Sequence, residues 1–279
     1  MAAHKPYWMP SEKIYVPVQV GAAGKKRVND QWKRDDEGNH ISEKNASFCE
    51  LTGLYWGWKN LDADIYGLCH YRRYFGNRKI WDKKRERLLD ADSIRSILSV
   101  RDVILPNKRH YWIETRESQY VHAHHREDLT VTENVLREKY PSFVMEWEHM
   151  LKTRSGHICN MFIMRRDSFM EYCEWLFDIL FDVEKRLDIS GYSEKDRRVF
   201  GYLGERLLDV WIQTKGLSFE EVSMITLESN TGCRKEFCFC SGNGKLDLQQ
   251  NVWNPGKRIV RSGTRRRHHG LCQNNSTAA

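Results

Sequence analysis

The stretch IYGLCHYRRYF, residues 65–75, indicates the fold class most directly. It starts as a short apolar run and passes directly into a histidine, two arginines and three aromatic side chains. Short apolar runs with polar boundaries are typical of buried strands. Open α/β sheets bind ligands at the carboxyl ends of their strands. The stretch therefore predicts a strand of an α/β sheet with a binding site at its end.

Other apolar runs and helical patterns alternate along the chain. Further strand-like runs occupy residues 14–18, 102–105 and 157–164. Apolar side chains recur at helical spacing over residues 42–60, 129–140, 168–188 and 195–213. Strands interleaved with helices are typical of the α/β class, and continuous apolar strands are typical of a mostly parallel sheet. We therefore expect a largely parallel sheet flanked by helices.

The net charge of +7 on the 279 residues is concentrated at the C-terminal end. Residues 229–279 carry nine Lys or Arg and two acidic residues, and they lack apolar periodicity. We expect one folded domain over residues 1–228 and a basic, disordered tail over residues 229–279. A basic tail raises the alternative of a nucleic-acid-binding protein. The electrically neutral body, which shows no nucleic-acid-binding motif, argues against that alternative.

Several common classes of protein lack support in the sequence. It contains no GxGxxG, Walker, GxSxG or HExxH motif, which are the usual signs of dehydrogenases, NTPases, hydrolases and zincins. No run approaches the roughly 20 apolar residues of a membrane span. The start of the chain also lacks the apolar core of a signal peptide. We expect a cytoplasmic protein with free thiols.

Two arginines and a glutamate are the strongest candidates for chemistry. Arg72 and Arg73 present planar donor forks that suit a phosphate or diphosphate, and Tyr71 can stack on a base or sugar. Glu205 lies in an apolar helical stretch, where burial would raise its pKa and suit it to general-base work. The alternative for Glu205 is an ion pair with a nearby arginine.

Polar residues on two helical patterns are weaker candidates. Trp56 and Lys59 lie on the polar stripe of residues 42–60. This stripe forms either one wall of a binding site or a solvent-exposed surface. His122 and His125 are three residues apart and supply only half of a metal site. We therefore expect these histidines to hydrogen-bond a ligand, with no metal bound by protein side chains.

Eight segments resemble a known family when taken together. They are HKPY and MP within residues 4–10, IYVPVQVG (14–21), ISEKN (41–45), ELTGLYWGWKN (50–60), GLCHYRRYF (67–75), NMFI (160–163), YCEWLFDIL (172–180) and RVFGYLGERLL (198–208). The set closely resembles the bacterial exopolysaccharide and capsular polysaccharide glycosyltransferases built on the domain of unknown function 4422. The resemblance covers residues 4–228 and excludes the tail.

The resemblance implies sugar transfer from a UDP-sugar, UDP-galactose or a relative, to a lipid-linked glycan in exopolysaccharide, capsule or O-antigen synthesis. It implies a GT-A-like nucleotide-sugar fold with Glu205 as base and Arg72 and Arg73 at the leaving diphosphate. The implied donor-binding residues are His4, Lys5, Ser42, Lys44, Asn45, Trp56, Lys59, His70 and Tyr71. The implied acceptor-binding residues are Asn160, His122 and His125.

Metal use and membrane contact complete the implied activity. Many GT-A enzymes hold Mg²⁺ or Mn²⁺ on an Asp-x-Asp at a strand end, whereas Asp62-Ala63-Asp64 precedes its strand here. We therefore prefer guanidinium groups over a metal for the diphosphate. The basic tail favours peripheral contact with the cytoplasmic face of the inner membrane. Family members usually begin with a longer first strand than Met1-Ala2-Ala3 allows, so we expect a truncated first strand. A further alternative is therefore that the chain is an inactive transferase fragment.

Overall fold

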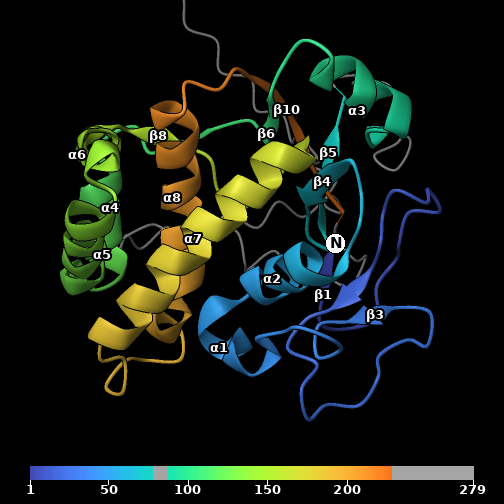
Figure 1. Cartoon of the computed structure of the whole chain (residues 1–279), viewed down its shortest axis with the longest axis horizontal. Coiled ribbons are helices and arrows are strands. Elements are labelled where there is room, and N and C mark those ends of the chain that lie inside the picture. The colour runs from blue at the N-terminus through green and yellow to red at the C-terminus, as the bar shows by residue number, and fades with distance from the viewer. Residues whose placement is uncertain (78–86, 228–279) are drawn as a thin grey trace, which may run out of the picture. The chain divides into compact units, whose positions relative to one another are not determined.

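The computed structural model describes residues 1–77 and 87–227, all of them within one compact unit, Met1–Gly242. The predicted tail, residues 229–279, lies outside the described residues. The central sheet has five strands, shown in Figure 1. Their order is β4 (Ile65–Leu68), β9 (Phe162–Arg165), β6 (Val103–Pro106), β10 (Phe219–Thr226) and β5 (Arg73–Gly76).

The central sheet is mixed in strand direction. β6 and β10 pair in parallel, whereas the β4–β9, β6–β9 and β5–β10 pairs are antiparallel. The α/β class is therefore confirmed, and the expectation of a mostly parallel sheet is wrong. The apolar runs reflect burial on both faces of the sheet, which flanking helices provide for strands of either direction.

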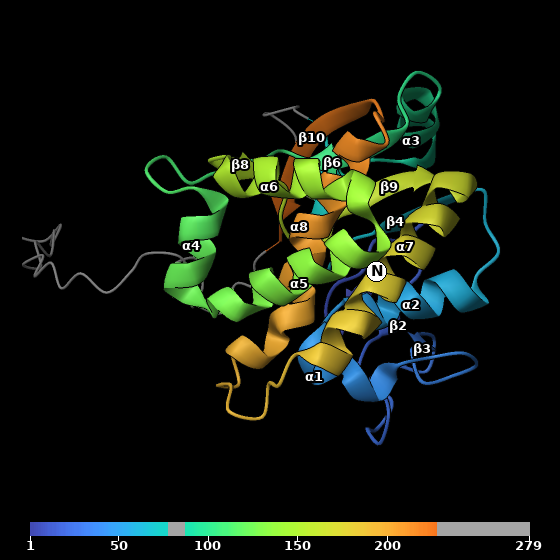
Figure 2. The ribbon, with the colours of Figure 1, turned by 60° about the vertical axis from the view of Figure 1, so that its left-hand side comes forward.

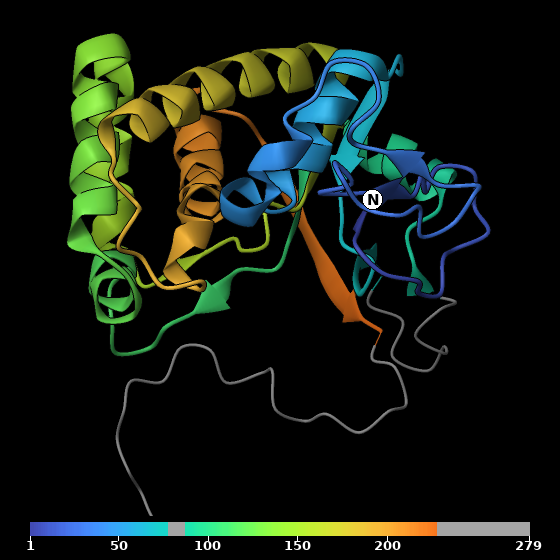
Figure 3. The ribbon, with the colours of Figure 1, turned by 90° about the horizontal axis from the view of Figure 1, so that it is seen from below.

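Strand alternation separates two cores. Val103 and Leu105 of β6 face the cluster of α7 (Arg166–Arg186) and α8 (Val199–Thr214), whereas Ile104 faces the opposite cluster with α3 (Ala91–Leu98). This alternation follows from the two-residue period of a strand. In Figure 3 the yellow helix α7 crosses the orange helix α8.

A small parallel sheet attaches the N-terminal segment to the central one. It consists of β1 (Ala2–Ala3), β2 (Val18–Gln19) and β3 (Lys33–Arg34). Ala2 donates its backbone N–H to Cys69 O at 2.9 Å, and its own carbonyl accepts from Tyr71 N at 3.1 Å. The beginning of the chain is thereby fixed beside the turn that joins β4 to β5.

Three predicted helices are confirmed and a fourth is interrupted. The confirmed helices are α5 (Arg126–Lys139), α7 and α8. The helix predicted over residues 42–60 is instead a 3₁₀ turn η1 (Ser42–Lys44), a short α1 (Asn45–Phe48) and α2 (Leu51–Asn60). The break falls at Cys49, whose φ of 53° lies in the left-handed region.

The remaining elements lie beside α8 or at the edges of the fold. They are β7 (Arg109–His110), α4 (Arg116–Ala123), the 3₁₀ turn η3 (Pro141–Phe143), α6 (Val144–Lys152), β8 (Ser155–Gly156) and the 3₁₀ turn η4 (Asp196–Arg198). β7 and β8 form a two-stranded antiparallel pair. Within the described ranges, no helix is long and apolar enough to cross a membrane.

Candidate functional site

A cavity of about 780 Å³ lies where β1, the β4–β5 turn, α1 and the N-terminal half of α8 meet. The predicted site residues that line it are His4, Asn45, His70, Tyr71, Arg72, Arg73 and Glu205. They come from four segments that are far apart in the sequence. The structure thus brings the arginines after β4 and the glutamate of α8 to one cavity.

Four arginines line the cavity. Arg72 and Arg73 follow β4, and Arg197 and Arg198 precede α8. The pKa of His4 is lowered by burial first and then by the positive charges of Lys5, Arg72, Lys25 and Arg198. A site in which several cations repel a proton from histidine is suited to an anion such as a diphosphate.

Three carboxylates, those of Glu50, Glu194 and Glu205, also line the cavity, and the charge of Glu50 acts on Glu205. Glu205 Oε1 accepts the backbone N–H of Cys159 at 2.7 Å. Burial raises the pKa of Glu205, and the negative charge of Glu50 raises it further. Glu50 Oε1 accepts from Asn160 Nδ2 at 2.7 Å and lies 3.9 Å from His70 Nε2. Glu205 is therefore held in place and biased toward proton acceptance.

The backbone of Cys159 and Asn160 arranges these groups. Both residues have left-handed φ values, 72° and 51°, which are uncommon outside glycine and cost free energy. The turn directs the Cys159 N–H to Glu205, while the Cys159 carbonyl accepts the Nε2–H of His70 at 2.6 Å. It also brings the Asn160 amide to Glu50. Such outliers typically concentrate at functional sites.

A glycine on α8 makes room for Asn160. A Cβ on Gly204 would lie 2.7 Å from Asn160 Oδ1, closer than real Cβ contacts allow. Asn160 Nδ2 also donates to the Gly201 carbonyl at 3.0 Å. Gly204 therefore allows the asparagine to pack tightly behind Glu50.

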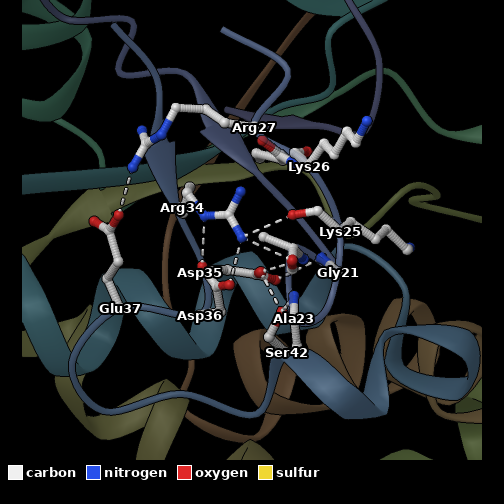
Figure 4. Close-up of polar contacts among 12 residues, drawn as sticks. Gly21, Ala23, Lys25, Lys26, Arg27, Arg34, Asp35, Asp36, Glu37 and Ser42 are labelled. Atoms are coloured by element: carbon white, nitrogen blue, oxygen red, sulfur yellow. Dashed lines mark hydrogen bonds and ion pairs between the residues drawn. The ribbon is translucent and has the colours of Figure 1, made fainter. Parts of the chain in front are cut away.

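Asp35 anchors the loop that follows β2, as Figure 4 shows. The fully buried Asp35 carboxylate accepts the backbone N–H groups of Gly21 and Ala22 at 2.8 and 2.9 Å. It also accepts the hydroxyls of Ser42 and Thr52 at 2.5 and 2.6 Å. These four bonds fix the loop that carries Lys25, one of the cations acting on His4.

Four of the predicted donor-binding residues do not line the cavity. Ser42 is buried against Asp35, and Lys44 Nζ pairs with Glu184 Oε1 at 2.6 Å. Trp56 is buried, with its Nε1–H donated to Glu37 O at 2.8 Å, and Lys59 Nζ lies 3.3 Å from the centre of the Trp58 ring. A fifth, Lys5, lies next to His4, with its Nζ 6.0 Å from the centre of the Tyr71 ring.

The three predicted acceptor-binding residues also lie outside the cavity lining. Asn160 is buried behind Glu50. His125 stacks on Tyr192, with their ring centres 4.0 Å apart. Tyr192 itself lines the cavity. His122 is exposed and pairs with Glu114. Among these three, only Asn160 contacts a cavity residue that carries charge.

The side chains of the cavity fit a divalent cation only in part. Among residues 1–77 and 87–227, no three or more His, Cys, Asp or Glu side chains gather as a metal cage requires. Mg²⁺ often takes one or two carboxylates and completes its shell with phosphate oxygens and water. Glu50, Glu194 and Glu205 are the cavity residues whose carboxylates fit that role. Asp62 and Asp64 do not line the cavity and lie beside Arg166.

The mixed sheet and the charged cavity define an α/β protein with a candidate ligand site beside a strand end. The chain belongs to the family described as Domain of unknown function (DUF4422), whose model matches residues 1–216. Its structure is similar to the apo structure of the bifunctional glycosyltransferase WbbM, with a TM-score of 0.74 and 26% identity.

The similarity to WbbM covers 90% of this chain and 47% of the WbbM chain. This chain therefore spans about half the length of that structural relative. No curated protein shows significant similarity to the chain. The family expected from the sequence segments is confirmed.

Proposed function

We propose that this chain is a glycosyltransferase of bacterial polysaccharide synthesis that moves a hexosyl group from a UDP-sugar to a lipid-linked glycan. Galactose is the first donor sugar to test. The proposal rests chiefly on one observation, the cavity that four arginines and the Glu205 and Glu50 carboxylates line together. Membership of the family and the similarity to a bifunctional glycosyltransferase support the reaction class.

The arginines of the cavity are assigned to the diphosphate of the donor. During transfer, the bond between the anomeric carbon and the diphosphate oxygen breaks, and negative charge grows on the departing UDP. Arg72 and Arg73 offer preorganised guanidinium donors for that charge. His4, with its lowered pKa, stays neutral at physiological pH and is able to donate one hydrogen bond to a phosphate oxygen.

Glu205 is assigned as the general base. It takes the proton of the acceptor hydroxyl as that oxygen bonds to the anomeric carbon. Its raised pKa brings the carboxylate closer to the value that suits base catalysis near neutral pH. In a reaction that retains anomeric configuration, the same carboxylate would stabilise the cationic transition state instead.

A thermal-shift panel with UDP, UDP-galactose, UDP-glucose, ADP and a short DNA duplex tests this function. Ligands that bind the native state raise its melting temperature, by an amount that grows with the logarithm of the ratio of free ligand concentration to Kd. We expect UDP and at least one UDP-sugar to stabilise the protein and ADP to have less effect. Stabilisation by DNA alone would favour a nucleic-acid-binding protein. No response to any nucleotide would favour an inactive fragment.

A further inference from the structure

The loop between β7 and α4 carries two adjacent, highly exposed apolar side chains. Trp112 is 81% exposed and Ile113 is 87% exposed, the highest values among the large hydrophobic residues that the structure describes. Figure 2 shows this segment as a loop that projects beside β8 and leads into the start of α4. An isolated exposed apolar residue is ordinary, but two adjacent ones on a projecting tip are typical of an interaction surface.

The loop is fixed at its base and presents its tip outward. Tyr111 donates its backbone N–H to Arg154 O at 2.8 Å, and Arg116 donates to Thr153 O at 2.8 Å. Trp112 has a φ of 55°, a left-handed conformation that is costly for a bulky residue. The exposed pair is therefore held by a closed loop with a defined geometry.

Basic residues surround the apolar tip. The exposed cations of the flanking segments are Arg109, His110 where protonated, Lys152 and Arg154. The nearby acid Glu114 is paired with His122, and Glu221 lies 3.4 Å from Lys108. An apolar tip with tryptophan and a basic rim is complementary to the interface of an anionic bilayer. Tryptophan is also enriched at that depth of the membrane.

Tyr111, at the base of this loop, lies within electrostatic reach of Glu205. The pKa of the Tyr111 phenol is raised by burial first, and the charge of Glu205 raises it further. The residues that follow Tyr111 form the tip.

We propose that residues 109–114 dock the protein on an anionic lipid bilayer, with Trp112 and Ile113 in the interface and the basic rim on the headgroups. The docking itself is independent of the proposed activity.

Vesicle co-sedimentation of the full chain tests the docking surface. The vesicles contain phosphatidylglycerol with phosphatidylcholine, or phosphatidylcholine alone. We expect the double variant Trp112→Ser, Ile113→Ser to bind the anionic vesicles at least about tenfold more weakly than the wild type. The matched control Val100→Ser, Met145→Ser removes two other exposed apolar side chains and should bind as the wild type.

Three results would overturn the proposal. Unchanged vesicle binding by the Trp112→Ser, Ile113→Ser variant removes the loop from the membrane contact. Loss of binding only in Arg265→Ser, Arg266→Ser, Arg267→Ser assigns the contact to the tail. The third result has two parts: the wild-type protein does not bind anionic vesicles, and the loop variant loses affinity for a soluble oligosaccharide acceptor. That result would assign Trp112 to stacking on a sugar instead.

A separate readout distinguishes this proposal from the proposed function. Trp112 and Ile113 do not line the cavity, so the thermal shift produced by UDP should be the same in the loop variant and the wild type. A normal UDP shift with lost vesicle binding supports the docking surface. Vesicle binding without any UDP response would contradict the proposed function and leave the docking surface in place.

Discussion

The Glu205 carboxylate accepts the backbone N–H of Cys159 at 2.7 Å, and the carbonyl of the same cysteine accepts the His70 ring N–H at 2.6 Å. The Cys159 backbone thus connects the glutamate of α8 to the strand end that carries Arg72 and Arg73. Because Glu205 is fixed and poorly hydrated, its protonation depends on its charged neighbours, above all on Glu50.

The pH dependence of turnover tests this coupling. A base must be deprotonated, and the pKa of Glu205 is raised from 4.5, so kcat/KM should fall as pH drops through a value above 4.5. Glu50→Gln removes the negative charge that raises this pKa. The acid limb of the profile should therefore move to lower pH in Glu50→Gln, whatever its maximal rate. An acid limb at the same pH in both proteins would show that Glu50 does not act on the titrating group.

Arg72→Ala and Arg73→Ala should each slow transfer by about a hundred- to a thousandfold, because each removes a preorganised donor for the leaving diphosphate. Initial rates at saturating donor measure this effect. Arg101→Ala is the matched control, since its side chain is exposed and lies 3.7 Å from Glu220 on the surface. Full activity in both Arg72→Ala and Arg73→Ala would contradict the assignment of the diphosphate site.

Asp35→Asn should lower the free energy of unfolding by about 1–3 kcal/mol, because an amide cannot accept all four hydrogen bonds of the buried carboxylate. Urea denaturation measures the loss. The exposed Asp30→Asn should stay within about 0.5 kcal/mol of the wild type. Equal stability of Asp35→Asn and the wild type would mean that Asp35 does not anchor the loop.

Chelation tests the preference for guanidinium groups over a metal. We expect transfer to continue after treatment with EDTA, since Arg72 and Arg73 are available to offset the diphosphate charge. The rate before and after EDTA, and after added Mn²⁺, provides the measurement. Activity that disappears with EDTA and returns with Mn²⁺ would instead assign a cation to Glu50, Glu194 or Glu205.

Helices α5, α7 and α8 were predictable from the sequence, and so were Arg72, Arg73 and Glu205 as candidate site residues. The 4-3 spacing of apolar residues predicts α7, and the apolar run before His70 predicts β4. Arg72 and Arg73 follow that strand, so they had to lie at its end. Glu205 lies in the apolar α8, and the structure places it in the cavity that Arg72 and Arg73 also line.

Other parts of the site depend on contacts that spacing does not reveal. The left-handed Cys49 breaks a predicted helix and frees Glu50 for the cavity, although cysteine gives no signal for this conformation. Trp56 seemed to face solvent or ligand, but the carbonyl of Glu37 and its loop cover it. β10 carries acidic residues within an eight-residue strand and so lacks the continuous apolar run used to find the others.

The most direct test of the central claim is a comparison of turnover and UDP binding in Glu205→Gln. The variant keeps the size of the side chain and an oxygen for the Cys159 N–H, but it cannot take a proton. We expect turnover to fall by about a hundred- to ten-thousandfold, with the Kd for UDP nearly unchanged. Glu174→Gln, an exposed position on α7, should match the wild type in both measurements. A folded Glu205→Gln protein with wild-type turnover would contradict the assignment of Glu205 as the base.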